Sequence, residues 1–205
     1  MMNENRYNMS FTAGALLYRE SLKVARLYEE MGDWQAVRAR VMDDNLLQMR
    51  TLSAAKRVFR EVASRLKHLT PAQLALLRTG TRQEQGHLLW LAICKRYRFI
   101  YDFAVEVMRE KFMRLDFDLP YDAYDVFFNN KAEWHPEVEG VADSTRKKLR
   151  QVLFKMMREA GLLTQDDQIL PAMLTPREID VIATDSASYL RVFPISPTEV
   201  EEWLA

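Results

Sequence analysis

Residues 143–163 of the chain read DSTRKKLRQVLFKMMREAGLL, and this stretch decides the fold class. Its apolar side chains recur every three or four residues, which places them along one side of a helix. They are Leu149, Val152, Leu153, Met156, Met157 and Ala160. Asp143 or Ser144 can cap the start of the helix, and Gly161 can end it in the left-handed conformation. The stretch is therefore predicted to be an amphipathic helix that packs on a core.

The remaining side chains make the opposite face of this predicted helix cationic. At about 100° per residue, several polar positions fall away from the apolar stripe. These are Lys147, Gln151, Lys155 and Arg158, with Lys148 beside them and Arg146 in the opening turn. One buried face and one basic face are typical of the recognition helix of a helix-turn-helix, with or without a wing. The alternative interpretation is an ordinary amphipathic helix whose solvated face happens to be basic.

Residues 53–68 repeat this design nearer the amino terminus. The apolar side of the predicted helix carries Ala55, Val58, Phe59, Val62 and Leu66, and the other side carries Lys56, Arg57, Arg60, Ser64 and Lys67. Two predicted helices come before it, one capped by Ser10 or Thr12 and ended by Gly32, and a shorter one over residues 33–43. This is the order of a helix-turn-helix, although the connection over residues 44–52 is longer than usual. A solvated basic face is again the alternative, because Lys and Arg are mostly exposed.

Capping boxes and an aromatic-rich core predict that the rest of the chain is also helical. Four boxes of the form Ser/Thr-x-x-Glu/Gln begin at Thr70, Thr81, Thr175 and Ser196, the last opening a terminal helix with Trp203. The main core is expected within residues 88–113, and Leu119-Pro120 begins another helix. Two segments have a strand character: residues 162–170 could form a small hairpin where a wing would lie, with an acidic tip, and residues 189–193 have strand composition.

We therefore predict an all-α protein with at most a short hairpin, forming a compact multi-helix globule with two helix-turn-helix-like units. Residues 1–69 would form the N-terminal helical unit, residues 70–115 the central helical core, and residues 116–205 the C-terminal unit with the second basic helix.

Composition predicts a reducing, cytoplasmic environment and binding through local patches. The 205 residues include 29 Lys and Arg against 29 Asp and Glu, so attraction to nucleic acid must come from local surfaces. Cys94 is the single cysteine, which excludes an intramolecular disulfide. No apolar run reaches the ~20 residues that cross a bilayer, and the first residues lack a secretion signal. We expect a monomer without a membrane contact.

The sequence contains no residue set that predicts catalysis. His68, His87 and His135 stand far apart, and no cysteine pair or glycine-rich phosphate loop is present. Two acidic groups lack the spacing of a cation-binding loop, and Asp is common at turns and caps for local reasons. They comprise Glu133, Glu137 and Glu139 in one group, and Asp116, Asp118, Asp122 and Asp125 in the other. We predict no enzyme activity, no cofactor and no metal.

Three runs of sequence resemble a known family. They are DDNLLQMRTLSAAKRVFREVASRL at 43–66, STRKKLRQVLFKMMREAGLL at 144–163 and SYLRVFPIS at 188–196. Together they resemble BrxA, the small helical component of bacteriophage exclusion (BREX) defence systems. The resemblance implies an all-helical, non-catalytic accessory protein that binds double-stranded DNA through two helix-turn-helix-like units. It also implies the other BREX components as candidate partners: a DNA methyltransferase, an ATPase, a phosphatase-like protein and a Lon-like protease.

Helical geometry and charge select the residues that would carry this role. The predicted DNA contacts are Lys56, Arg57, Arg60 and Lys67 on the first basic helix, and Arg146, Lys147, Lys148, Lys155 and Arg158 on the second. Such residues would mainly neutralise phosphates, which gives little sequence preference. Two other interpretations remain open: a protein-interaction adaptor whose basic faces dock acidic partners, and an RNA-binding protein resembling helical antitermination factors.

Overall fold

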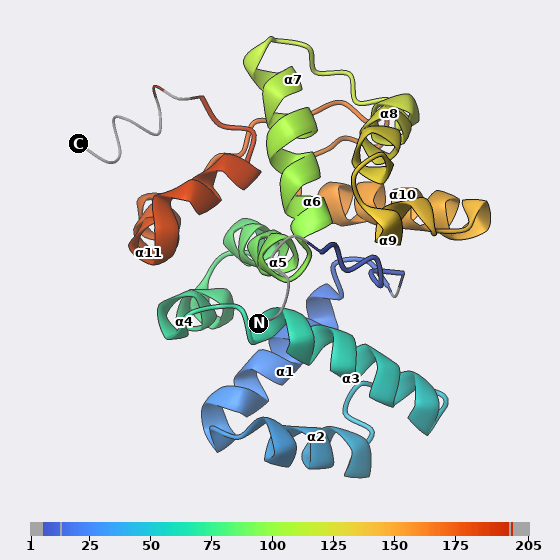
Figure 1. Ribbon diagram of the computed structural model, residues 1–205. Helices are drawn as coiled ribbons and strands as arrows, with labels where there is room; N and C mark the ends of the chain where they lie inside the picture. The colour runs from blue at the N-terminus through green and yellow to red at the C-terminus, as the bar shows by residue number, and fades with distance from the viewer. Residues whose placement is uncertain (1–5, 13, 197, 199–205) are drawn as a thin grey trace.

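Helix α5, Arg82–Arg96, runs through the centre of the computed structural model, with the other helices arranged around it (Figure 1). Each residue from 84 to 94 is buried, so this helix has no solvent-facing side. It contacts α1, α3, α4, α6, α10 and η2. The structure describes residues 6–12, 14–196 and 198.

The elements follow one another with short connections. In order they are α1 (Tyr18–Met31), α2 (Trp34–Asp43), α3 (Leu52–Leu66), α4 (Pro71–Thr79), α5, α6 (Arg98–Phe103), the π-helix η1 (Ala104–Arg109), α7 (Glu110–Met113), α8 (Tyr121–Ala132), α9 (Pro136–Glu139), α10 (Asp143–Glu159), α11 (Pro176–Ser186) and the 3-10 helix η2 (Ala187–Val192). Helices α1, α2 and α3 pack on one another on one side of α5. The continuous rod of α6, η1 and α7 lies on the other side, with α8 to α10 beside it (Figure 1).

The all-α prediction is confirmed. Among the described residues, β structure is limited to two isolated bridges, Leu163 with Ile169 and Asp118 with Gln168. The first bridge is the predicted hairpin, since Thr164 N–H donates to Gln168 O at 2.9 Å. The second joins the hairpin to the segment before α8, where Ile169 N–H donates to Phe117 O at 2.7 Å. The hairpin is therefore attached to the body of the protein along one side.

Local capping signals placed several helix ends correctly. The predicted capping boxes at Thr70, Thr81 and Thr175 are all formed. Gly161 follows α10 in the left-handed conformation, with φ of 78°, as predicted. The helix predicted after Ser196, with Trp203, lies outside the described residues.

Three local predictions were wrong. Helix α1 begins at Tyr18, after the left-handed Leu17, and not near Ser10 or Thr12. Helix α10 has Ala142 at its N-cap without a side-chain hydrogen bond, so neither Asp143 nor Ser144 caps it. Residues 189–193, predicted to have strand character, lie in and just after η2. A short apolar run has the same pattern in a buried strand and a buried helix, and no strand among the described residues is available for pairing.

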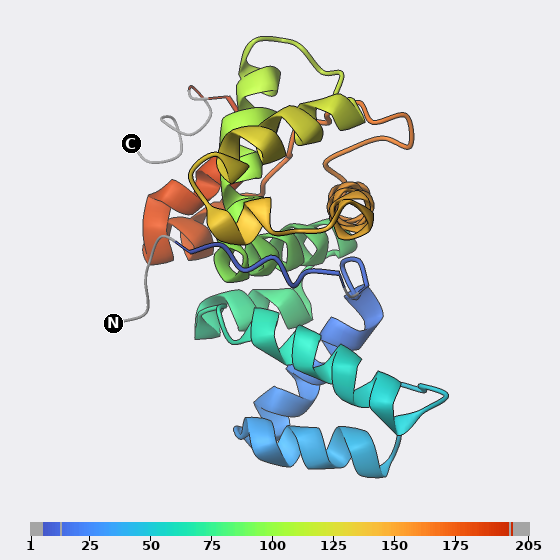
Figure 2. The same ribbon diagram turned by 45° about the vertical axis from the view of Figure 1, so that its right-hand side comes forward.

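Residues 6–12 and 14–17 form a strap that crosses the molecule between α3 and α9 (Figure 2). Tyr7 N–H donates to Glu137 Oε1 at 2.7 Å, and Leu16 N–H donates to Glu159 Oε2 at 2.8 Å. On the other side, Arg65 Nη1 donates to Ala15 O at 2.7 Å. Phe11 is fully buried between these contacts. The strap therefore joins the α1–α3 bundle to α9 and α10.

Glu84 on α5 is a buried carboxylate that joins this helix to α11. Its oxygens accept hydrogen bonds from Thr81 N–H at 2.7 Å, the Thr175 hydroxyl at 2.7 Å and Arg177 Nε at 2.6 Å. The Arg177 guanidinium, together with these donors, lowers the pKa of Glu84 from its ordinary value of 4.5 to about 2. The charged carboxylate is therefore the form that stabilises the fold.

Replacing Glu84 with Gln should cost about 2 kcal/mol of unfolding free energy at about pH 7, because it removes the charged acceptor of these hydrogen bonds. The folded pKa lies below the unfolded value, so this stabilisation is complete above about pH 4.5 and disappears as the pH falls toward 2. The difference between wild type and Glu84→Gln in urea unfolding should shrink over that window. Glu110→Gln is the control, because the Glu110 side chain is 47% exposed, and it is expected to change stability by less than about 0.5 kcal/mol. A difference that is independent of pH would contradict the charge argument.

Candidate nucleic-acid interface

Helix α3 divides into a buried face and a basic face, as its sequence predicts. Thr51 caps its start, with Oγ1 accepting from Ala54 N–H at 3.1 Å. The buried side chains include Ala55, Phe59, Val62 and Leu66. All four predicted contact residues of this helix are exposed: Lys56, Arg57, Arg60 and Lys67.

These four cations line one groove along α3 and the facing side of α2. The groove has a volume of about 1000 Å³. It is lined by Arg38, Leu52, Ser53, Lys56, Arg57, Phe59, Arg60, Ala63, Ser64 and Lys67. We call it the basic groove. Five of its lining residues are cationic and none is acidic, so the positive charge is not neutralised within it.

None of the five cations pairs with a carboxylate in the described part of the chain. Lys67 has an aromatic neighbour instead, with its Nζ 5.4 Å from the centre of the Trp34 ring. Arg38 on α2 is a member of the groove that the sequence did not predict. Its position depends on how α2 packs against α3, which no local pattern reports.

The long connection between α2 and α3 is a compact, hydrogen-bonded loop. The Asn45 side chain accepts from Met49 N–H at 3.0 Å and donates to Met49 O at 3.1 Å. Leu47 is buried beneath it, and Lys23 Nζ donates to Leu46 O at 2.6 Å. These contacts set the start of α3 relative to α1 and α2.

Helix α10 buries its predicted apolar stripe and exposes part of its basic face. Leu149, Val152, Leu153, Met156 and Met157 are all buried. Of the five predicted cations, the structure leaves Lys147, Lys148 and Lys155 exposed. Lys155 Nζ lies 3.7 Å from Glu159 Oε1, a loose pair one turn along the helix. None of the α10 cations lines the basic groove.

The two predicted arginines of α10 are held by intramolecular partners. Arg146 donates through Nε to Asp125 Oδ1 at 3.1 Å and through Nη1 to Asn129 Oδ1 at 2.9 Å. Arg158 pairs with Asp167 at the hairpin tip. Only about a fifth of each arginine side chain is accessible, 23% for Arg146 and 19% for Arg158. Arg146 thus fixes α10 to α8, and Arg158 fixes it to the hairpin.

The separation of the α10 cations into exposed lysines and paired arginines predicts that substitutions at two neighbouring positions differ in their effect on stability. Arg146→Ala should lower the free energy of unfolding by about 1–2 kcal/mol, because it removes a partly buried charged hydrogen-bond network. Lys147→Ala should change it by less than about 0.5 kcal/mol, since an exposed lysine has no such partners. Urea unfolding at neutral pH measures both. Equal effects at the two positions would contradict the separation into structural and free cations.

Neither a membrane-spanning helix nor a metal-binding cluster is present in the described part of the chain. No helix in residues 6–12 and 14–196 is long and apolar enough to span a bilayer. The same residues contain no group of three or more His, Cys, Asp or Glu side chains placed to hold a metal ion.

Comparison with known proteins places the chain in a family. The sequence model of the BrxA family matches residues 5–186, which is most of the chain. The chain belongs to the BrxA family. BrxA is a component of the BREX phage-defence system.

Relatives of this BrxA-family chain come from several bacteria. It is 27% identical over 159 residues to the BREX protein BrxA of Escherichia coli O9:H4 (strain HS), covering 78% of this chain and 75% of the relative. It is 28% identical over 163 residues to the BREX protein BrxA of Bacillus cereus (strain H3081.97), covering 80% and 82%. A crystal structure of an uncharacterized protein from Magnetospirillum magneticum has the same fold, with a TM-score of 0.76, 22% identity, and coverage of 91% of this chain and 97% of that one.

Proposed function

We propose that this protein is a non-enzymatic accessory component of a BREX system that binds double-stranded DNA and helps to localise the methylation and defence complex on it. It would act in the cytoplasm as a monomer. Family membership supports the defence role, and the names of its relatives supply the BREX context. The candidate partners are the other BREX components: the methyltransferase, the ATPase, the phosphatase-like protein and the Lon-like protease.

The observation that carries the DNA-binding proposal is the basic groove. Five exposed cations from two helices line it without a carboxylate among them. Such a surface attracts phosphates and releases the counterions condensed on DNA, which is the main source of binding without sequence preference. The exposed Lys147, Lys148 and Lys155 provide a second cationic surface on α10. We assign phosphate contacts to these residues first. Arg146 and Arg158 act mainly through the position of α10.

Helix packing is compatible with the two helix-turn-helix-like units of the proposal. Helices α1, α2 and α3 contact one another, and α3 presents its basic face outward as a recognition helix does. The second unit would use α8 to α10 followed by the hairpin. The hairpin tip carries Asp166 and Asp167, so a phosphate contact there is not part of the proposal.

Charge reversal in the basic groove tests the proposal. The double variant Lys56→Glu/Arg60→Glu should lower affinity for a duplex by at least about a hundredfold near 0.1 M salt, because it leaves two phosphates without a cation and adds repulsion. The slope of log affinity against log salt should become shallower by about 0.9 for each phosphate that is no longer neutralised. Fluorescence anisotropy with duplex DNA, single-stranded DNA and RNA measures this, with far-UV circular dichroism and melting as folding controls.

Two arginines on α2 provide a matched control for the groove. Arg38 lines it, whereas Arg40 pairs with Asp44 at 2.8 Å outside it. Arg38→Gln should weaken duplex binding about fivefold or more, and Arg40→Gln should leave it nearly unchanged. Unchanged affinity in the double variant would refute the DNA-binding proposal. Tighter binding of RNA than of duplex would favour an RNA-binding function in its place.

A second candidate function is a protein-interaction adaptor within the defence complex. The observation that favours it is Trp134, which is 81% exposed just after α8. Val126 on the same helix is 60% exposed, and Glu133 and Glu139 are exposed nearby in the sequence. Exposed Trp is energetically unfavourable in a free monomer and is enriched where proteins bind one another.

Nuclease-treated co-purification distinguishes the adaptor from the DNA-binding function. If the adaptor function holds, the BREX methyltransferase co-expressed with this protein should be retained after nuclease digestion. Trp134→Ala should reduce that retention by about tenfold or more, since a buried Trp anchor contributes about 2 kcal/mol or more at an interface. The Lys56→Glu/Arg60→Glu variant should keep it. Release of the methyltransferase on nuclease treatment alone would show that DNA bridges the two proteins.

A further inference from the structure

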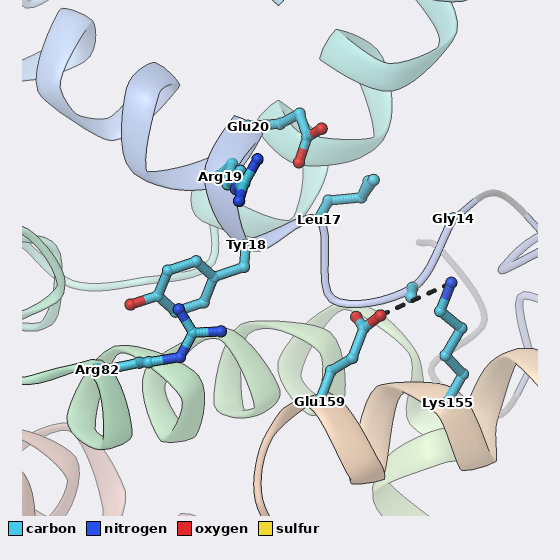
Figure 3. A pocket seen from close by; sticks show the side chains of 9 residues that line it. Gly14, Leu17, Tyr18, Arg19, Glu20, Arg82, Lys155 and Glu159 are labelled. Carbon is cyan, nitrogen blue, oxygen red and sulfur yellow. Dashed lines mark ion pairs between the residues drawn. The ribbon is translucent and has the colours of Figure 1, made fainter.

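A second cationic cavity lies where the α1–α3 bundle meets α5 and α10 (Figure 3). Its volume is about 460 Å³. It is lined by Gly14, Ala15, Leu17, Tyr18, Arg19, Glu20, Arg82, Lys155 and Glu159. We call it the junction cleft. Three cations come from three different helices, Arg19 from α1, Arg82 from α5 and Lys155 from α10, so only the tertiary fold brings them together.

Arg82 is positioned for anion binding by its aromatic neighbour. Its guanidinium carbon lies 4.9 Å from the centre of the Tyr18 ring (Figure 3). The Tyr18 hydroxyl donates to Gln85 on α5, which fixes the ring. Stacking holds the plane of a guanidinium but leaves its N–H donors at the edge free. Arg82 is exposed and forms no ion pair with another described residue. It is therefore a preorganised donor without a carboxylate acceptor in the described part of the chain.

The two carboxylates of the cleft offset only part of the charge of its three cations. Glu159 is engaged by the strap, because its Oε2 accepts from Leu16 N–H at 2.8 Å. Its other oxygen is 3.7 Å from Lys155 Nζ, and the Lys155 side chain remains 61% exposed. Arg19 is exposed and has no carboxylate partner among the described residues, and Glu20 forms no ion pair with any of them. The cleft thus holds three cations against two carboxylates, of which only Glu20 is uncommitted, and it keeps a net positive charge.

Lys155 makes the junction cleft continuous with the exposed cations of α10. Lys148 and Lys155 are seven residues apart, so they lie on the same side of the helix, about 10 Å apart along its axis at 1.5 Å per residue. A DNA backbone that follows the face of α10 from Lys148 to Lys155 arrives at the mouth of the cleft. Lys155 is therefore shared between the two surfaces.

We propose that the junction cleft binds a phosphate group of the DNA backbone, held by Arg82, Arg19 and Lys155. This inference rests on the proposed DNA-binding function and adds a phosphate site that does not belong to either predicted basic helix alone. Arg82 supplies two N–H donors to the phosphate, a geometry that lysine cannot reproduce. Arg19 and Lys155 contribute charge from the two sides. The site would hold duplex DNA across the junction between the α1–α3 bundle and α10.

Two substitutions with opposite expected effects on DNA affinity test the junction cleft. Arg82→Ala should weaken binding of a 20-base-pair duplex about tenfold near 0.1 M salt and make the salt slope shallower by about 0.9, as expected when one phosphate is no longer neutralised. Arg82→Lys should recover only part of the affinity. Glu20→Gln should strengthen binding, since it removes the uncommitted carboxylate. Arg114→Ala is the matched surface control, because Arg114 is 77% exposed on the distant α7 end and lies outside the cleft.

The outcomes separate this inference from the proposed function. If Lys56→Glu/Arg60→Glu abolishes duplex binding but Arg82→Ala and Glu20→Gln both leave it unchanged, the function stands and the cleft site is refuted. If the wild-type protein binds no DNA, both are refuted. If inorganic phosphate raises the melting temperature of the wild type but not of Arg82→Ala, while duplex affinity is equal in the two, the cleft binds free phosphate and the backbone assignment is wrong. Melting of each variant without ligand shows that it is folded.

Discussion

The structure depends on the burial of α5 on every side. A helix without a solvent face can keep polar side chains only if each has a partner, because an unpaired buried polar group costs free energy. Three of these side chains have a partner on α11 or η2: Glu84 pairs with Arg177, His87 Nδ1 lies 2.8 Å from Glu178 Oε1, and Trp90 Nε1 donates to Val192 O at 2.9 Å. These contacts fix α11 and η2 against the central helix. Arg82 lies at the exposed start of the same helix. The packing of α5 in the core therefore also positions the junction cleft.

A second buried hydrogen-bond network fixes the inner side of α3. It thereby determines which of the basic residues of α3 face solvent. Arg65 is 2% exposed and donates to Glu61 Oε1 at 2.9 Å and to the strap at Ala15 O. The Tyr97 hydroxyl donates to the same Glu61 carboxylate at 2.6 Å, and burial together with that carboxylate raises the pKa of Tyr97 to about 12. The inner side of α3 is thus fixed by charged hydrogen bonds as well as by apolar packing. Its outer side carries Lys56, Arg57 and Arg60, which form no ion pair in the described part of the chain.

Cations in this protein therefore have two separate tasks. Arg146 joins α10 to α8 and Arg158 joins α10 to the hairpin through carboxylates, while Arg65 pairs with Glu61 on its own helix and donates to the strap at Ala15 O. Arginine suits that task because its several donors can contact two groups at once. The exposed cations of the basic groove have no carboxylate partner in the described part of the chain, nor do Lys147 and Lys148 on α10, and Lys155 has only the loose pair with Glu159 at 3.7 Å. A net charge of zero over the whole chain is consistent with this arrangement, since some of the acidic residues are engaged in the structural pairs. Binding would then be local and sensitive to salt.

The sequence by itself determined the helical class, several helix ends and the exposed cations of α3, because apolar periodicity, capping boxes and the left-handed Gly161 act within one or two turns of chain. It could not place the start of α1 or distinguish η2 from a strand, since both depend on what the segment packs against. The tertiary structure alone decided that Arg146 and Arg158 pair with Asp125 and Asp167. It also brought Arg38 into the basic groove, and Arg19 and Arg82 to Lys155. The physical reason is that charge pairing acts over a few ångströms in space, whereas a helical pattern reports only which side of its own axis a residue occupies.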